Sequence, residues 1–300
     1  MRSLRVLMAA MQLRGAPGDD VFRSTSARAA TCAADTPSSA RFKQGDDFWV
    51  VSREPGSERA DLPIFAARAG AVDLAASPPG VAPTREDVAG AEGVFLVSNV
   101  LSGAECDAIV ALSEAMGYTE DAPVSLGRDV RRNENCVWIA DEPTLNGVVY
   151  ARAAPLLPPF VELTSRRGDA LRVGPLAGLN ARWRLYKYGE ADVFRPHTDG
   201  GWPGSGLRAD GRLARDVHDG DRFSWLTFLL YLNDDFDGGD TVFYAPGGAP
   251  AARVRPKKGA ALCFFHGHHP LSPLHEGALV TRGVKYVARS DVLYMNGDLA

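Results

Sequence analysis

The sequence has few of the features that mark the most specialised classes of protein. It contains four cysteines, and no two of them form a C-x-x-C pair, so the spacing indicates neither a zinc site nor a dense disulfide framework. No uninterrupted apolar run approaches the roughly 20 residues that a membrane-spanning helix needs. The sequence therefore predicts a globular chain with free thiols and no membrane span.

A strong excess of charge of one sign is also lacking. The formal net charge is -4 at pH 7, from 33 Lys and Arg against 37 Asp and Glu. Because nothing in this balance attracts a phosphate backbone, no nucleic-acid partner is expected. The 300 residues, 45% of them hydrophobic, are enough to bury one large core.

The first 92 residues carry the weakest signals. Residues 1–45 are rich in Arg, Ser and Ala, which is typical either of a disordered tail or of an organellar transit peptide. The localisation is therefore expected to be cytoplasmic or organellar. Residues 46–92 hold short apolar islands between Gly, Pro and Ala, and they predict a poorly defined extension with one strand at most.

Ordered structure is predicted from Gly93 onward, which gives a main domain over residues 93–300. Ser102 and Glu105 form a capping box that opens a helix, and Gly117 ends it. A second helix is expected to begin near Pro143 and to end near Pro155.

After Leu179 the pattern changes to short β-type runs separated by Gly and Asp. Such runs are typical of a sandwich or a jelly-roll barrel. The predicted fold class is α+β and mainly β, with a double-stranded β-helix (jelly-roll) core over about residues 179–295 and supporting N-terminal helices. The runs cover residues 181–188, 223–232, 241–244, 261–265 and 284–294.

Three residues form a candidate metal site. His197 and Asp199 are two positions apart, so on extended backbone both side chains leave the same face. His275 follows 78 residues after His197, which is enough chain to complete a jelly roll and return beside it. Two imidazoles and one carboxylate form a facial triad that leaves metal positions open for other ligands.

Lys285 strengthens this interpretation. It lies ten residues after His275 on a predicted core strand. A cation inside a barrel is costly unless an anion meets it, and a carboxylate of a bound cosubstrate would supply that anion. Arg289 shares its strand face and is the alternative partner for that carboxylate. On the strand before the triad, alternation predicts that Tyr186 and Tyr188 point inward, and that Trp183 and Leu185 pack outward.

With these motifs in order, residues 179–294 resemble the catalytic domain of the prolyl 4-hydroxylase-like Fe(II)/2-oxoglutarate-dependent dioxygenases. The motifs are Tyr188-Gly189 nine residues before His197, the H-x-D at 197–199, the run from Thr227 to Asn233, Gly238-Gly239-Asp240-Thr241, Pro256-Lys257-Lys258-Gly259, His275 and Lys285. The similarity is weaker over the helical region from Gly93.

The resemblance implies a function and a set of roles. His197, Asp199 and His275 would bind Fe(II), Lys285 would pair with the C5 carboxylate of 2-oxoglutarate, and Tyr188 and Thr227 would line its pocket. The reaction would use O2 to hydroxylate an unactivated C–H bond while 2-oxoglutarate is converted to succinate and CO2, and ascorbate could assist. No catalytic residue beyond the metal site is expected. The prime substrate is left open between a protein side chain, with peptidyl proline as the family example, and a small molecule.

Other interpretations remain at this level. A cupin-like metal protein could use similar ligands without Lys285, and an alkylation-repair-type demethylase would need a basic groove with stacking aromatics. The Gly-, Asp- and Arg-rich stretch from 201 to 221 is expected to be a loop at the mouth of the site. The remaining histidines are expected in surface loops, and residues 132–136 are expected to form a solvated loop. These histidines are His218, His266, His268 and His269.

Overall fold

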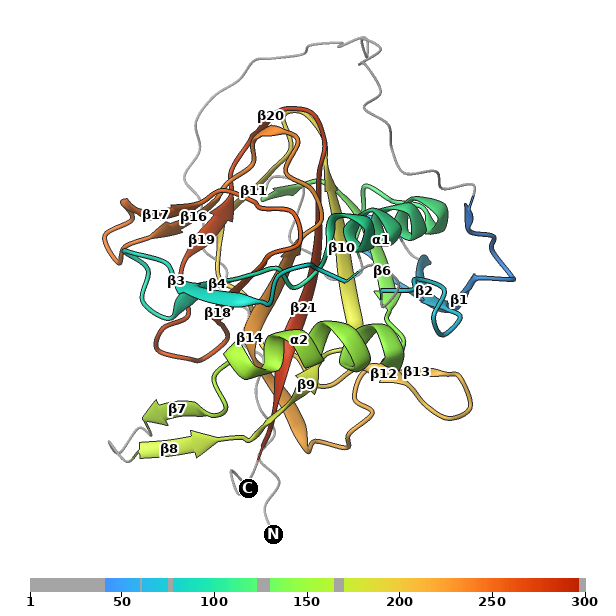
Figure 1. Ribbon diagram of the computed structural model, residues 1–300, viewed down its shortest axis with the longest axis horizontal. Coiled ribbons are helices and arrows are strands. Elements are labelled where there is room, and N and C mark those ends of the chain that lie inside the picture. Colours follow the sequence, from blue (N-terminus) through green and yellow to red (C-terminus); the bar gives the residue numbers. More distant parts are fainter. Residues whose placement is uncertain (1–40, 60, 75–77, 123–129, 165–169, 297–300) are drawn as a thin grey trace. The chain divides into compact units, whose positions relative to one another are not determined.

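The computed structural model describes residues 41–59, 61–74, 78–122, 130–164 and 170–296 (Figure 1). Most of residues 1–45, expected to form a tail or transit peptide, lie outside the described residues, and so does Cys32. The three described cysteines, Cys106, Cys136 and Cys263, are free and buried.

The largest element is a ten-stranded, mostly antiparallel sheet. Its strand order is β1-β2-β6-β10-β21-β14-β18-β4-β3, and β9 also pairs with β21. The strands are β1 (Phe48–Glu54), β2 (Leu62–Ala67), β3 (Thr84–Asp87), β4 (Val94–Ser98), β6 (Glu134–Ile139), β9 (Leu176–Leu179), β10 (Arg182–Tyr188), β14 (Arg222–Tyr231), β18 (Ala261–Phe265) and β21 (Lys285–Met295).

A five-stranded sheet packs against one face of this large sheet. Its order is β17-β16-β19-β11-β5, from β5 (Arg131–Arg132), β11 (Val193–His197), β16 (Thr241–Tyr244), β17 (Pro250–Val254) and β19 (His275–Gly277). Tyr188 and Phe264 of the large sheet share one buried cluster with Phe194 and Phe243 of the small sheet. The predicted jelly-roll fold is thus confirmed, with a core between two facing sheets.

Three short two-stranded sheets complete the strands. They are β7 (Val161–Thr164) with β8 (Ala170–Val173), β12 (Gly206–Leu207) with β13 (Leu213–Ala214), and β15 (Asp237–Gly238) with β20 (Val280–Arg282). The β12–β13 hairpin lies within the stretch expected to be a loop from 201 to 221.

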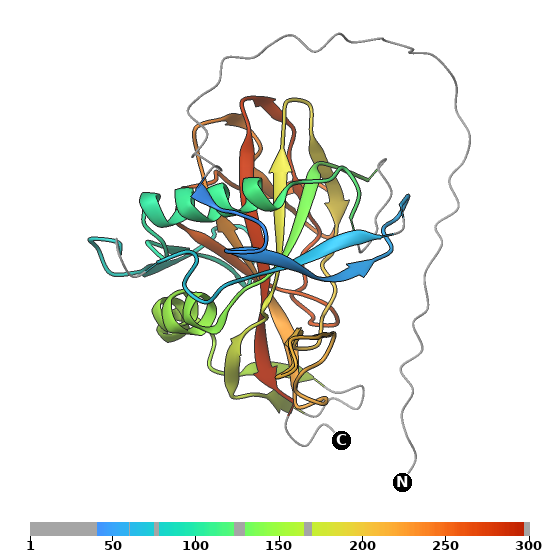
Figure 2. The ribbon, with the colours of Figure 1, turned by 90° about the vertical axis from the view of Figure 1, so that its right-hand side faces the viewer.

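Helices cover the other face of the large sheet. Helix α1 (Gly103–Met116) lies across its strands (Figure 2), and a second helical segment runs through Pro143–Tyr150, α2 (Ala151–Ala153) and Ala154–Leu156. Both predicted helices are confirmed. The first eight residues of the second segment are a π-helix. Ile109 and Leu145 pack with Trp183 and Leu185 of β10 in one buried cluster.

The capping box is formed as predicted, and it is also part of an ion pair. The backbone N–H of Ser102 donates to Glu105 Oε2 at 2.7 Å, and the Glu105 N–H donates to the Ser102 hydroxyl at 3.2 Å. Arg152 of α2 donates to both Glu105 oxygens at 2.9 Å. Glu105 is 2% exposed, so this pair joins the two helical segments inside the core.

We expect Glu105→Ala to lower the free energy of unfolding by about 3–5 kcal/mol, because it removes the carboxylate half of the capping box and leaves the Arg152 guanidinium without its buried partner. Urea denaturation measures this change. The double variant Glu105→Leu/Arg152→Met should recover much of the loss, since neither charge remains buried alone. Equal losses in the two variants would show that the ion pair is not the cause.

Two expectations about the N-terminal half were wrong. Residues 46–92 contain three strands instead of one at most, because β1 pairs with β2, β2 adds in parallel to β6, and β3 pairs with β4. The segment 132–136 is not a solvated loop, because β6 is an interior strand between β2 and β10, and Asn133 and Asn135 are buried. In both cases strand pairing with distant residues overrides the polar local sequence.

Candidate active site

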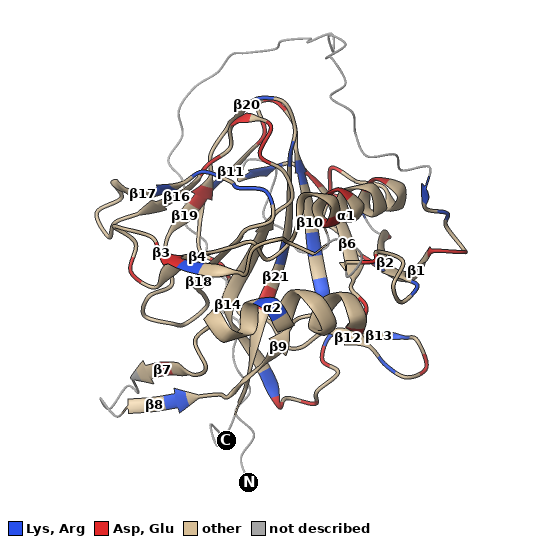
Figure 3. Ribbon diagram, in the orientation of Figure 1, with Lys and Arg blue, Asp and Glu red and all other residues tan. Residues whose placement is uncertain are grey.

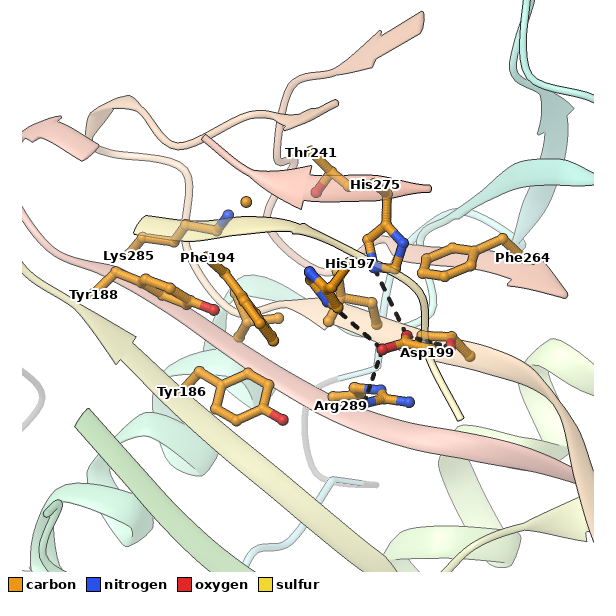
Figure 4. Close-up of a pocket in the computed structure, with 14 residues that line it drawn as sticks. Tyr186, Tyr188, Phe194, His197, Asp199, Thr241, Phe264, His275, Lys285 and Arg289 are labelled. Atoms are coloured by element: carbon orange, nitrogen blue, oxygen red, sulfur yellow. Dashed lines mark hydrogen bonds and ion pairs between the residues drawn. The ribbon is translucent and has the colours of Figure 1, made fainter. Parts of the chain in front are cut away.

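The three predicted metal ligands lie together. His197 ends β11 and His275 begins β19, and the two residues face each other as a register pair of these antiparallel strands. Asp199 follows two residues after His197. One ligand atom from each residue lies within 4.8 Å of the other two (Figure 4). The structure thus brings together residues that are 78 positions apart in the sequence.

The imidazole rings are held in the tautomer that a metal requires. His197 Nδ1 lies 2.7 Å from the carbonyl of Arg195, and His275 Nδ1 lies 3.2 Å from the carbonyl of Pro273. A carbonyl oxygen can only accept, so each Nδ1 carries the hydrogen. Each Nε2 is then free to bind a metal, and these atoms lie 3.7 and 3.8 Å from the two oxygens of Asp199.

The protonation states also suit a metal. Burial, followed by the neighbouring His275, lowers the pKa of His197 to about 4, and burial lowers the pKa of His275. Burial alone would raise the pKa of Asp199, but Arg289 and the two histidines hold it well below its usual range. At neutral pH the site presents two neutral imidazoles and one carboxylate, which is the donor set of non-haem Fe(II) oxygenases.

Two further side chains fix the carboxylate of Asp199. The hydroxyl of Thr227 donates to Asp199 Oδ2 at 2.6 Å, and Arg289 Nη1 lies 3.1 Å from Asp199 Oδ1. Arg289 Nη2 also donates to Asp291 Oδ1 at 3.2 Å. Both of these carboxylates are buried. The guanidinium of Arg289 is therefore already paired next to the metal site.

Lys285 lies at the other end of the same pocket. The three metal-site residues and Lys285 line this pocket together. Lys285 is 3% exposed, and its ammonium donates to the carbonyl of Gly239 at 2.6 Å. The ammonium also lies 5.3 Å from the centre of the Tyr188 ring and 5.9 Å from that of Tyr231. Among the described residues, no carboxylate forms an ion pair with it.

Gly239 makes room for this lysine. Its φ of +67° is strained for other residues, and a Cβ there would lie 3.2 Å from Lys285 Cδ and 2.9 Å from the ring of Phe236. The Gly238-Gly239 motif of the sequence thus has a structural role beside the cosubstrate anchor. Tyr231 and Thr241, joined by a 2.8 Å hydrogen bond between their hydroxyls, were missed as neighbours of the pocket. Only their place in the family motifs could have indicated them.

The faces of β10 are as predicted. Tyr186 and Tyr188 line the pocket, whereas Trp183 and Leu185 pack into the cluster under the helices. Strict alternation along an extended strand produces this division.

The assignment of every remaining histidine to the surface was wrong in part. His266 is fully buried, and its ring lies 2.9 Å from the Ser224 hydroxyl and 3.1 Å from the Thr227 hydroxyl. His269 is also buried and stacks on Phe265 at 3.7 Å. His268 is exposed and His218 is half-buried. The buried pair directly follows the central strand β18, whose position in the sheet the local sequence does not reveal.

Comparison with known proteins finds a family match for the segment that holds the site. Residues 183–290 match the family model of the 2OG-Fe(II) oxygenase superfamily. This segment is therefore a 2OG-Fe(II) oxygenase domain. The domain makes the protein a 2-oxoglutarate-dependent dioxygenase, and its cofactors are Fe(II), 2-oxoglutarate and O2. The matched segment contains the whole candidate site and ends one residue after Arg289.

Solved structures with a similar chain course include prolyl hydroxylases. One is a viral collagen prolyl hydroxylase from Paramecium bursaria Chlorella virus 1 in complex with 2-oxoglutarate, at 16% identity and a TM-score of 0.41, covering 68% of this chain and 97% of that one. Another is a Pseudomonas putida prolyl 4-hydroxylase, at 16% identity and a TM-score of 0.42, covering 68% of this chain and 94% of that one. A third is a prolyl hydroxylase from Trichoplax adhaerens, bound to a peptide fragment of hypoxia-inducible factor. It has 15% identity and a TM-score of 0.42, covering 68% of this chain and 84% of that one.

No curated protein matches this chain. Among the described residues, no helix is long and apolar enough to cross a membrane.

The state of Lys285 predicts a pH dependence of 2-oxoglutarate binding. Burial lowers the pKa of Lys285 to about 7. Since a carboxylate binds the ammonium form, affinity should be full below pH 7 and should fall above it by up to about tenfold per pH unit. Anaerobic titrations of the iron-loaded protein between about pH 6.5 and 8.5 measure this slope.

The matched control is Lys285→Arg, since a guanidinium keeps its charge over this range and should bind 2-oxoglutarate with little pH dependence. The same slope in both proteins would assign the pH dependence to another group.

Proposed function

We propose that this protein hydroxylates an unactivated C–H bond of a prime substrate, with His197, Asp199 and His275 holding Fe(II) and Lys285 holding the C5 carboxylate of 2-oxoglutarate. The observation that carries this assignment is one pocket with the three ligands at one end and, at the other, a buried ammonium that no described carboxylate pairs with. A dicarboxylic oxo-acid fits this arrangement, because one end can chelate a metal and the other can pair with the cation.

When bound, the iron and its cosubstrate supply the oxidising chemistry: O2 is consumed, 2-oxoglutarate leaves as succinate and CO2, and one oxygen atom enters the substrate C–H bond. The residues of this chain hold and shield the site. Thr227 and Arg289 orient Asp199 through one oxygen each. Phe194 stacks on His197 at 3.6 Å and Phe264 packs on His275 at 4.6 Å, so aromatic rings fix both imidazoles and exclude water from the pocket.

The prime substrate is proposed to be a protein side chain or a small molecule. Peptidyl proline is the first candidate to test, because the motifs resemble those of prolyl 4-hydroxylases.

The test is an anaerobic titration of the apoprotein, first with Fe(II) and then with 2-oxoglutarate. We expect a weak visible charge-transfer band that requires both additions, followed by slow succinate release when O2 is admitted. If iron binds and no band forms at any 2-oxoglutarate concentration, the dioxygenase assignment fails and a cupin-like metal protein becomes the better explanation.

A further inference from the structure

A second cavity adjoins the metal pocket. Its lining includes Arg131, Arg182, Arg184, Asn135 and Tyr186. We call it the arginine cavity. Tyr186 lines both cavities and so stands between them. Figure 3 shows the basic residues of β10, two of which contribute to this wall.

The charges of the arginine cavity are not balanced. Arg182 pairs with Glu54 at 2.8 Å, and Arg184 pairs with Asp291 at 3.3 Å. Arg131 has no carboxylate partner among the described residues. Two of the three guanidinium groups thus contact a carboxylate, although Asp291 is shared with Arg289, and Arg131 is left to pair with a bound anion.

Hydrogen-bonding capacity is also unused in this wall. Arg182 Nε and Asn135 Oδ1 are buried and have no hydrogen-bond partner among the described residues. Arg182 is 4% and Asn135 3% exposed. Buried polar atoms in native proteins nearly always have a partner, so two unpaired atoms from residues that line one cavity point to a polar group that binds there.

The unpaired arginine also lies beside the metal pocket. The guanidinium carbon of Arg131 is 5.8 Å from the centre of the Tyr186 ring and 5.7 Å from that of the Phe194 ring. Phe194 in turn stacks on the metal-site residue His197. Arg131 lies next to Phe194 because β5 and β11 pair at these two residues. A single aromatic ring therefore separates Arg131 from a metal-site imidazole.

We propose that the arginine cavity binds a carboxylate of the prime substrate, with Arg131 as the principal partner, and so selects a substrate whose carboxylate lies a few bonds from the carbon to be hydroxylated. This inference rests on the proposed function. The planar fork of a guanidinium matches a carboxylate in two parallel hydrogen bonds, which fixes orientation as well as charge. The carboxylate belongs either to a small acid or to an acidic side chain of a peptide.

The experiment measures binding to protein loaded with Fe(II) and saturating 2-oxoglutarate under anaerobic conditions, so that the Lys285 site is already filled. The small probes are N-acetyl amino acids and the matching N-acetyl amino-acid amides. The peptide probes carry glutamate next to the candidate residue, or glutamine at the same position. Calorimetry gives each affinity.

We expect the best acid to bind at least about tenfold more tightly than its amide counterpart, a difference of about 1.4 kcal/mol. A preference seen with the small probes identifies a small acid as the source of the carboxylate, and a preference seen with the peptides identifies an acidic side chain. Arg131→Gln should abolish the preference, and Arg131→Lys should retain part of it. Arg172→Gln is the control, because Arg172 is 60% exposed on β8, pairs with Glu162 and does not line either cavity.

Equal affinity of acids and amides, or an unchanged preference in Arg131→Gln, would overturn the inference. The Arg131→Lys variant keeps the test decisive if Arg131→Gln does not fold. Failure of the proposed function gives a different result, since the charge-transfer band would then be absent from the unmodified protein before any probe is added.

Discussion

Replacing Asp199 with asparagine should lower iron affinity by at least about two orders of magnitude and abolish succinate release. Even residues that only support metal ligands cost about 10–100-fold when lost, and Asp199 supplies the single negative charge of the triad. Asparagine keeps the shape of the side chain, and its amide oxygen can still accept the hydrogen bond from Thr227. The change therefore isolates the charge.

Iron retained after anaerobic gel filtration and succinate release under O2 measure this effect. His268→Gln is the matched control, since His268 is an exposed histidine near His275 in the sequence and should leave both quantities unchanged. Iron binding and turnover that survive in Asp199→Asn would mean that the metal lies elsewhere.

Replacing Lys285 with alanine should weaken 2-oxoglutarate binding by roughly 100-fold or more and leave iron binding nearly intact. Removing one partner of a buried charge pair costs about 3–5 kcal/mol, because the other charge is left uncompensated. Here the uncompensated charge would be the C5 carboxylate of 2-oxoglutarate. The intensity of the charge-transfer band, followed as a function of 2-oxoglutarate concentration, gives the affinity.

Arg289→Gln distinguishes the two candidate cations. Arg289 is engaged by Asp199 and Asp291, so we expect its loss to weaken iron binding more than 2-oxoglutarate binding. If Arg289→Gln instead abolishes the 2-oxoglutarate affinity and Lys285→Ala retains it, the roles of the two residues are reversed.

The geometry of the metal site could be predicted from the sequence because its main signals are local. His197 and Asp199 lie two residues apart, and the spacing of Tyr186 and Tyr188 divides the faces of β10 by simple alternation. The burial of Lys285 follows from its place in an apolar run. The capping box at Ser102 and Glu105 likewise depends on neighbours three residues apart.

Long-range pairing decided what the sequence did not show. The strands of residues 46–92 exist because β2 pairs with β6, and Asn135 is buried because β10 covers the other edge of β6. No local pattern contains these partners.

The sequence by itself therefore determined the fold class, the likeness to 2-oxoglutarate dioxygenases and the residues of the triad, since periodicity, caps and motif order are properties of short segments. Only the tertiary structure decided that Arg289 pairs with Asp199, that His266 is buried beside Thr227, and that three arginines share a cavity next to the metal pocket. Those features depend on which strands become neighbours, and a charged side chain acquires its role only from the partners that this pairing brings to it.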